Sequence, residues 1–270
     1  MTRILVTGGT GVLGSQVVSR LLATGDTVRV SSRRDRRAQT GARPGDGDPE
    51  GVEWARCSLE TGEGLTDTVA GVDTVVHCAS SPFRRTRQVD VDGAGLLLAA
   101  ARQAGVAHFL YISIIGIDRI PLPYYKAKLA AEKAIEDSGL AYTILRAPQF
   151  HTLLDTILAG FLRFPVGLLP SGFRFQPIDA GEVAGRMIEF AAGEPAGRVP
   201  DIAGPEVRTV NDLARAWLKA RGKRRLLIPL PLFGKVASGF RAGHNTAPDS
   251  KYGKITWEQW LAGKYGGDGS

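Results

Sequence analysis

Residues 4–14 of the chain read Ile4-Leu-Val-Thr-Gly-Gly-Thr-Gly-Val-Leu-Gly14, a short apolar run followed at once by a glycine-rich loop. Gly8, Gly11 and Gly14 are spaced G-x-x-G-x-x-G, and Gly9, Gly11 and Gly14 also fit G-x-G-x-x-G. In either register the glycines permit a tight turn, a close approach of backbone to a pyrophosphate, and close packing of the following helix, whose N-terminus attracts phosphate. The stretch therefore predicts a dinucleotide-binding loop. The residues expected to contact the dinucleotide are Gly8, Thr10, Gly11, Val12, Leu13 and Gly14.

Beyond this loop, the first 150 residues alternate short apolar runs with amphipathic stretches of helical length. The apolar runs lie at residues 4–6, 28–30, 72–76, 109–112 and 142–145, and the helical stretches at 16–22, 94–103 and 126–137. Strands that are apolar throughout and alternate with helices indicate a parallel sheet covered on both faces. Because crossovers between parallel strands are almost always right-handed, the pattern predicts an α/β fold with a doubly wound parallel sheet of the Rossmann type.

After residue 150 the alternation weakens, which indicates a second, smaller part of the chain. Asp179-Ala-Gly-Glu182 is a capping-box pattern, and Thr209-Val-Asn-Asp212 also predicts the start of a helix. Residues 229–270 are rich in Pro, Gly and aromatic side chains, as in a small irregular lobe. We expect residues 1–150 and 177–203 to form the Rossmann domain, and residues 151–176 and 204–270 to form a substrate-binding lobe.

The composition is that of a folded globular chain. Its 270 residues are 43% hydrophobic and 23% charged, which excludes a disordered, collagen-like or long coiled-coil protein. The net charge of +7 suggests nucleic acid, but the basic residues fall in local clusters at 33–43, 84–87 and 219–225. No aromatic residues alternate with them, as they do in proteins that bind single strands. We therefore expect no nucleic-acid partner.

Signals for a membrane, a metal ion or an oxidising compartment are weak in this sequence. No stretch reaches the roughly 18 uncharged apolar residues that a membrane span needs, and the N-terminus does not resemble a signal peptide. Cys57 and Cys78 are too few for a disulfide framework, and the four histidines have no metal-ligand spacing. We expect a cytoplasmic monomer or homodimer that acts on a small molecule, with no membrane partner and no metal ion.

The end of the second predicted strand bears on which nicotinamide dinucleotide is bound. A site for NAD(H) needs an acidic residue about 20 residues beyond the glycine loop, whereas this chain has Val30-Ser-Ser-Arg-Arg34. Arg33 or Arg34 can bind a 2′-phosphate bidentately, with Ser32 as a hydrogen-bond partner. NADP(H) is therefore favoured. Asp35 keeps NAD(H) possible, and the arginines could also be the solvated start of a basic loop.

A tyrosine and a lysine one helical turn apart form the candidate acid/base pair. Tyr124 and Lys128 lie at positions i and i+4, and so share one face of the helix that follows the 109–112 strand. A phenol of pKa about 10 is a poor acid at neutral pH, and a nearby ammonium lowers this pKa by favouring the phenolate. Tyr124 thereby becomes a usable proton donor to a carbonyl that receives a hydride. Such a pair can also arise by chance, and its position after that strand is what singles it out.

Together these motifs resemble the short-chain dehydrogenase/reductase superfamily, in particular its atypical branch of NmrA-like and isoflavone-reductase-like NAD(P)-binding proteins. The resemblance covers most of residues 1–205 and includes Glu132 in the tyrosine helix. It also includes the segments Val72-Asp-Thr-Val-Val-His-Cys-Ala79, Thr143-Ile-Leu-Arg-Ala-Pro148 and Gln176-Pro-Ile-Asp179. It implies a reductase that uses NAD(P) on a carbonyl or conjugated double bond of a small hydrophobic molecule.

The resemblance also implies roles for single residues. Tyr124 would be the acid/base group, Lys128 would bind the nicotinamide ribose and lower the tyrosine pKa, and Ser113 would steady the substrate oxygen. The resemblance places Cys78, Ala79 and Ser80 along the cofactor, Ser58 and Leu59 at the adenine, and Pro148, Gln149 and Phe150 on the nicotinamide side.

The chain departs from the family at the serine. Where the family often has a Ser-Ser pair, this chain reads Ile112-Ser-Ile-Ile-Gly116, which puts Ile114 in the usual catalytic place and Ser113 one position short of it. Ser58, where Asp is common, is a milder departure. Without the oxyanion partner catalysis would be slower, or lost, as in an NmrA-like regulator that senses NAD(P) without turnover. A nucleotide-sugar epimerase or dehydratase uses the same site but usually has a longer C-terminal domain.

Other chemically active side chains have simpler structural explanations. His77 lies on a predicted buried strand and is expected to be a hydrogen-bonded core residue, while His151 could face the substrate. Cys78 has no basic partner that would make it a nucleophile. The arginines at 84–87 are either solvated or part of a clamp for an anionic substrate.

Overall fold

The computed structural model describes residues 2–33, 51–81 and 85–266, and the chain divides into two compact units. The first unit consists of Met1–Ser113, Lys126–Leu145 and Ala184–Val199; the second consists of Ile114–Tyr125, Arg146–Val183 and Pro200–Ser270. Several segments expected in the Rossmann domain, such as residues 114–125, group with the second unit instead.

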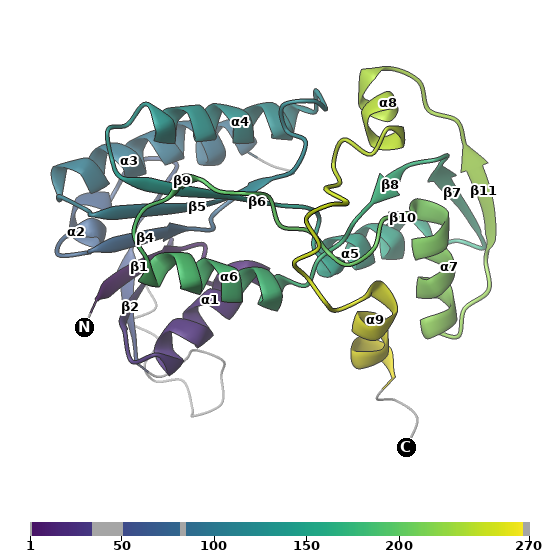
Figure 1. The fold of residues 1–270 in the computed structure, drawn as a ribbon, viewed down its shortest axis with the longest axis horizontal. Helices are drawn as coiled ribbons and strands as arrows, with labels where there is room; N and C mark the ends of the chain where they lie inside the picture. Colours follow the sequence, from purple (N-terminus) through teal and green to yellow (C-terminus); the bar gives the residue numbers. More distant parts are fainter. Residues whose placement is uncertain (1, 34–50, 82–84, 267–270) are drawn as a thin grey trace. The chain divides into compact units, whose positions relative to one another are not determined.

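The first unit is built on a seven-stranded sheet with the order β3-β2-β1-β4-β5-β6-β9 (Figure 1). Its strands are β1 (Arg3–Thr7), β2 (Thr27–Ser32), β3 (Val52–Arg56), β4 (Thr74–His77), β5 (His108–Ile114), β6 (Tyr142–Ala147) and β9 (Gly197–Arg198). β1 pairs in parallel with both β2 and β4, and its Leu5 and Val6 are fully buried. The predicted α/β fold with a doubly wound parallel sheet is confirmed. β3 was not predicted from the sequence, because this half-buried edge strand contains Glu53 and Arg56 and has no continuous apolar run.

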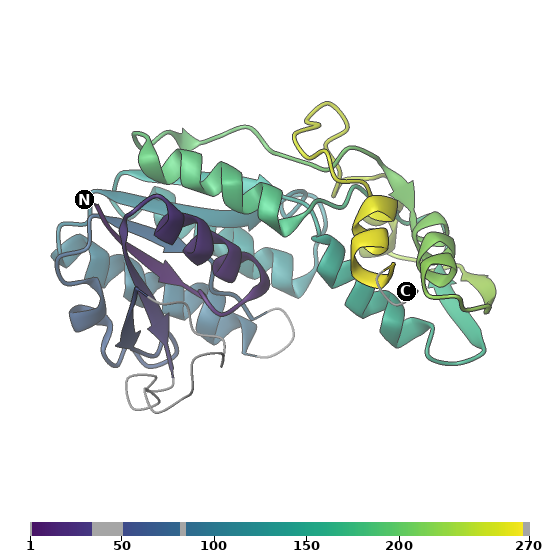
Figure 2. The same ribbon diagram turned by 90° about the horizontal axis from the view of Figure 1, so that it is seen from below.

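Helices cover both faces of this sheet. They are α1 (Val12–Ala23), α2 (Leu65–Val69), α3 (Gly93–Gln103), α4 (Pro123–Glu136) and α6 (Ala180–Ala192), with the π-helix η2 (Arg87–Asp92) before α3. α2, α3 and α4 lie on one face, and α1 and α6 on the other (Figures 1 and 2). On the first face, Leu65, Leu97 and Ile135 from the helices pack on Leu5 and Phe109 of the strands. This burial stabilises the sheet, in which the carboxyl ends of the parallel strands β1, β2 and β4 lie at the same end.

The second unit has its own hydrophobic core. It contains α5 (His151–Phe161), α7 (Val210–Ala220), α8 (Lys235–Arg241) and α9 (Trp257–Tyr265), with β7 (Val166–Pro170) parallel to β11 (Leu226–Leu230) and β8 (Arg174–Phe175) antiparallel to β10 (Arg208–Thr209). The buried carboxylate of Asp155 accepts hydrogen bonds from Trp217 Nε1 at 2.6 Å, Lys264 Nζ at 2.7 Å and the Tyr265 hydroxyl at 2.6 Å. One side chain of α5 therefore ties α7 and α9 to it.

The helix starts predicted after residue 150 are present. Thr209 Oγ1 accepts from the Asp212 N–H at 3.2 Å, and Asp179 Oδ1 accepts from the Gly181 N–H at 2.8 Å. In a capping box the Glu182 side chain would accept a hydrogen bond from the Asp179 N–H. Here the Glu182 carboxylate accepts from the Lys254 N–H at 2.6 Å instead.

The expectation of an irregular segment at 229–270 was wrong, because α8 and α9 lie there. A capping box between Thr256 and Gln259 was the missed signal. Across the described ranges, none of the helices is both long and apolar enough to cross a membrane.

Candidate functional site

The glycine loop between β1 and α1 has little room for side chains. A Cβ atom on Gly8 would lie 2.7 Å from the backbone of Ala79, and one on Gly14 would lie 2.2 Å from the Gly8 carbonyl oxygen. Gly8 also has φ +70°, and its carbonyl accepts from the Gly11 N–H at 2.9 Å. Gly11 caps α1, and no described side chain bonds to the first turn of that helix as a cap. The N–H groups at the start of α1 are therefore left for a ligand.

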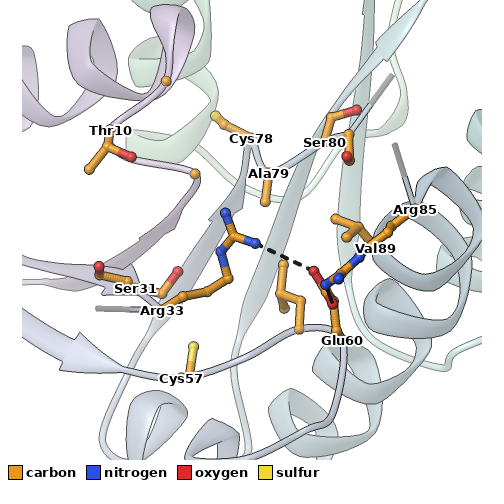
Figure 3. Close-up of a pocket in the computed structure, with 15 residues that line it drawn as sticks. Thr10, Ser31, Arg33, Cys57, Glu60, Cys78, Ala79, Ser80, Arg85 and Val89 are labelled. Atoms are coloured by element: carbon orange, nitrogen blue, oxygen red, sulfur yellow. Dashed lines mark hydrogen bonds and ion pairs between the residues drawn. The ribbon is translucent and has the colours of Figure 1, made fainter. Parts of the chain in front are cut away.

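A cavity of about 810 Å³ lies beside this loop (Figure 3). It is formed at the carboxyl ends of the central strands, where ligands bind in open α/β sheets. Its lining residues are Gly8, Thr10, Gly11, Ser31, Ser32, Arg33, Cys57, Leu59, Glu60, Cys78, Ala79, Ser80, Ser81, Arg85 and Val89.

The cavity brings together many of the residues selected from the sequence. Those that line it are Gly8, Thr10, Gly11, Ser32, Arg33, Leu59, Cys78, Ala79 and Ser80. Leu13 is buried inside α1, and Val12 is exposed at the start of that helix. The Ser58 hydroxyl accepts from the Thr61 N–H at 3.3 Å, in a turn next to the cavity lining.

Three predicted residues on the nicotinamide side, Pro148, Gln149 and Phe150, belong to the second unit. There Gln149 Nε2 donates to the Tyr125 hydroxyl at 2.8 Å. Arg34, proposed from the sequence as a phosphate ligand, lies outside the described residues, as does Arg84. The roles of all these residues stay predictions.

Glu60 joins two arginines within the cavity. Its Oε1 lies 3.4 Å from Arg33 Nη1 and its Oε2 lies 2.6 Å from Arg85 Nη1, and the two guanidinium groups reach it from opposite sides (Figure 3). The arginine side chains are 76% and 66% exposed and that of Glu60 is 19% exposed, so water screens both ion pairs and a ligand can replace them. Among the described residues, Arg85 is the one non-glycine with a positive φ, +53°.

Glu60 and Arg85 were not selected as cofactor ligands from the sequence. Arg85 lies in the arginine run at 84–87, for which a solvated role and a clamp were both left open. No sequence motif surrounds Glu60. It is recognised as a site residue only in the folded structure, because the segments that follow β3 and β4 both line the cavity.

Lys128 is a buried cation on α4. Its side chain is only 2% exposed, Nζ donates to the Ile112 carbonyl at 2.9 Å, and the ammonium lies 4.2 Å from the centre of the Tyr111 ring. Burial lowers the pKa of Lys128 to about 8, against the opposing influence of the Asp90 carboxylate. The Asp90 carboxylate in turn accepts from Ser80 Oγ at 2.6 Å. The charge of Lys128 therefore interacts with Asp90, and Asp90 in turn binds Ser80 of the cavity lining.

Tyr124 lies in the first turn of α4, one turn before Lys128, and is half-buried. The neighbouring Tyr125 differs from it in environment: it is 4% exposed, and burial raises its pKa well above the usual value for a phenol. Tyr125 also receives the hydrogen bond from Gln149. Of these two adjacent phenols, Tyr125 is thus built into the interior.

Ser113 lies inside the molecule near the end of β5. It is 2% exposed, and its hydroxyl finds no hydrogen-bond partner among the described residues. The following residue, Ile114, is half-buried and packs with Tyr124 against the core of the second unit. The departure noted in the sequence therefore corresponds to a buried serine followed by an apolar side chain.

Burial shifts the pKa values of the remaining candidates, two histidines and one cysteine. His77 Nδ1 and Thr7 Oγ1 are 2.6 Å apart, and burial lowers the pKa of His77 to about 3, which confirms the predicted core histidine. His151 is 1% exposed and packs on the rings of Trp257 and Trp260. Burial raises the pKa of the Cys78 thiol to about 12, so the thiolate is disfavoured. Within the described ranges, no group of three or more His, Cys, Asp or Glu residues could hold a metal ion.

Comparison with known proteins identifies the family to which the chain belongs. A family described as NAD(P)H-binding matches residues 8–155. The chain is 32% identical over 150 residues to the chloroplastic protein High Chlorophyll Fluorescence Phenotype 244 of Arabidopsis thaliana, covering 54% of this chain and 36% of that protein. It is 26% identical over 230 residues to quinone oxidoreductase 2 of Escherichia coli, covering 82% and 75%. The chain thus spans less than half the length of the Arabidopsis protein.

Solved structures share the fold. The NADPH-dependent quinone oxidoreductase of Escherichia coli, complexed with NADPH, superimposes with a TM-score of 0.80 at 21% identity over 97% of this chain and 99% of that chain. A nucleoside-diphosphate-sugar epimerase from Staphylococcus aureus gives 0.76 at 20% identity over the same shares. These identities show the fold alone. With the family match over residues 8–155, they confirm an NAD(P)-binding domain of the Rossmann fold.

Proposed function

Because the chain belongs to the NAD(P)H-binding family, we propose that it is an NADP(H)-dependent oxidoreductase that reduces a carbonyl or conjugated double bond of a small hydrophobic molecule. The observation that carries this proposal is the buried ammonium of Lys128, placed one helical turn from Tyr124 and coupled through Asp90 to the cavity wall. Burial of an ammonium group lowers stability through desolvation, and ionisable groups with strongly shifted pKa values cluster at functional sites.

The residues of the cavity fit a phosphorylated dinucleotide. The backbone of Gly8 and Gly11 and the uncapped start of α1 suit the pyrophosphate. Ser32 and Arg33 suit an adenosine 2′-phosphate, and Leu59 offers an apolar surface to the adenine. When bound, the reduced nicotinamide supplies a hydride to the substrate.

In this proposal Tyr124 gives the proton that completes the reduction. The fixed positive charge of Lys128 stabilises the phenolate that remains, which makes the phenol a stronger acid. In this proposal the buried Ser113 is not used as the oxyanion donor that the resemblance implies. A turnover number at the low end of the range for such enzymes is therefore expected.

The cofactor preference is testable at Arg33. Arg33→Ala is expected to raise the Kd for NADPH roughly 10- to 100-fold, because a charge-assisted bond to the 2′-phosphate is lost, and to leave the Kd for NADH within about twofold. Arg56→Ala is the matched control, since Arg56 is exposed at the end of β3 and pairs with Glu63 rather than lining the cavity. Fluorescence titration with both dinucleotides measures the effect. If Arg33→Ala weakened NADPH and NADH binding equally, Arg33 would not be a ligand of the 2′-phosphate.

A second test concerns Glu60. Its carboxylate lies beside both cavity arginines, where it repels a phosphate of about two negative charges. Glu60→Gln is therefore expected to tighten NADPH binding roughly three- to tenfold without tightening NADH binding. Glu63→Gln, which changes the exposed partner of Arg56, is the control. Weaker NADPH binding in Glu60→Gln would mean that the carboxylate is needed to orient the arginines.

The buried Ser113 and the apolar Ile114 favour a second candidate, an NmrA-like regulator that binds NAD(P)H without turnover. Titration with NADPH and NADH, followed by assays on a panel of aldehydes, ketones, enones and quinones, separates the two. Micromolar NADPH binding with reduction of at least one compound supports the reductase. The same binding with no reduction across the panel supports the regulator.

A further inference from the structure

The parallel pair β7 and β11 in the second unit presents an apolar face to solvent. In its register Leu226 pairs with Val166 and Ile228 pairs with Leu168, and these four side chains are between 40% and 61% exposed. Of the 13 large apolar side chains that are exposed in the described part of the chain, nine lie in residues 161–168 and 226–233. Phe233, which follows β11, is 88% exposed. We call residues 161–168 and 226–233 the β7–β11 face.

This face is additional to the core of the unit. Side chains alternate along a strand, and the inward positions already serve the core, because Leu169 is 1% exposed and Leu227 packs against the core cluster. The outward positions of a sheet that borders on water are normally polar. A contiguous set of apolar side chains at such positions marks an interaction surface.

The chain places its excess positive charge in the segment that contains β11, with Lys223, Arg224 and Arg225 directly before Leu226. Residues 213–248 contain eight Lys and Arg and no Asp or Glu, so the rest of the chain is close to neutral despite the overall charge of +7. A depression of about 680 Å³ between the end of α7 and β11 is lined by five of these cations and by Leu227 of β11. The five are Arg215, Lys219, Lys223, Arg224 and Arg225. In the described part of the structure none of them forms an ion pair with an acidic side chain.

We propose that the β7–β11 face binds the surface of an anionic lipid bilayer. Exposed Leu, Ile and Phe side chains would enter the boundary between headgroups and acyl chains, while the adjoining cations would contact anionic headgroups. The positive charge of this segment favours an anionic membrane over a nucleic acid or a second copy of the chain. An apolar strip offers nothing to a nucleic acid backbone, and two copies of the chain would bring two unneutralised basic clusters to one interface.

Flotation with vesicles tests the proposal on the full chain. The protein is expected to float with vesicles of 70% phosphatidylcholine and 30% phosphatidylglycerol and to stay unbound with pure phosphatidylcholine, because the cations need a negative surface. Lys223→Ser with Arg224→Ser is expected to weaken binding about 30-fold, since each basic residue near the surface contributes about fivefold. Leu226→Ser with Phe233→Ser is expected to weaken it at least about tenfold.

Matched controls use exposed residues elsewhere. Arg20→Ser with Arg102→Ser removes two exposed cations, and Leu96→Ser with Val207→Ser removes two exposed apolar side chains. Both are expected to bind vesicles like the wild type, and thermal unfolding verifies that all variants are folded. Absence of binding to anionic vesicles, or equal binding by face and control variants, would overturn the proposal. So would a dimer in light scattering that Leu226→Ser with Phe233→Ser dissociates, because the face would then be occupied by a second copy.

Discussion

Tyr124→Phe is expected to lower kcat about 10²- to 10⁴-fold, the range that a positioned general acid contributes. The phenyl ring preserves the packing of Tyr124 against the core of the second unit, so that the loss reports on the hydroxyl. NADPH affinity should change by less than about twofold, because the glycine loop and Arg33 are unaffected. Steady-state kinetics on a reduced substrate, together with cofactor titration, measure the two effects separately.

The adjacent tyrosine supplies the control. Tyr125→Phe removes the acceptor of the hydrogen bond from Gln149 and is expected to lower the free energy of unfolding by about 1 kcal/mol. It should leave kcat within about threefold, because the buried Tyr125 hydroxyl is already committed to that bond. If Tyr124→Phe retained wild-type turnover, the proton would have to come from another group, and the assignment of Tyr124 would be wrong.

Lys128→Met is expected to abolish the pH dependence of stability that this lysine creates. Between pH 8 and 10.5 the unfolded chain holds the lysine proton while the folded protein has released it, since the folded pKa is about 8 and the ordinary value 10.5. The unfolded state then binds more protons, so the free energy of unfolding rises with pH, by about 3 kcal/mol across the window. Below pH 8 both states are protonated, and the burial of the charge lowers stability in full.

Urea unfolding of Lys128→Met and of the wild type, from pH 7 to 10.5, measures this change in the free energy of unfolding. The stability of Lys128→Met relative to wild type should decrease by about 3 kcal/mol over that range. The comparison is needed because the Cys78 thiol, whose pKa is raised to about 12, acts in the opposite direction in both proteins. Lys126→Met, at an exposed position of the same helix, should parallel the wild type. A constant difference between Lys128→Met and wild type would show that the ammonium is solvated.

The sheet and the glycine loop could be predicted from the sequence because burial on both faces leaves a strong pattern. The centre of β1 is the buried apolar run Ile4-Leu5-Val6, and a Cβ atom on Gly8 or Gly14 would lie less than 3 Å from backbone atoms. β3 could not be predicted, since a half-buried edge strand with charged side chains has no apolar run. Periodicity reports on burial, and it fails where burial is partial.

The polar part of the site was less predictable. Glu60 and Arg85 are 25 positions apart and meet only after folding, through polar side chains that follow no period. The apolar β7–β11 face could not be predicted for a different reason: alternate apolar residues on a short strand are too few to give the signal of a segment that spans a membrane. Both features depend on which surfaces the fold brings side by side.

The two salt bridges of Glu60 place a carboxylate, a counter-anion that belongs to the chain, beside the arginines of the cavity. A carboxylate fixed beside Arg33 and Arg85 acts at a high effective concentration, so inorganic phosphate and other small anions in solution compete poorly for the two guanidinium groups. A dinucleotide can displace the carboxylate because it gains further contacts at the glycine loop in the same cavity. The site would therefore discriminate between a free phosphate and one carried on a cofactor before any chemistry begins.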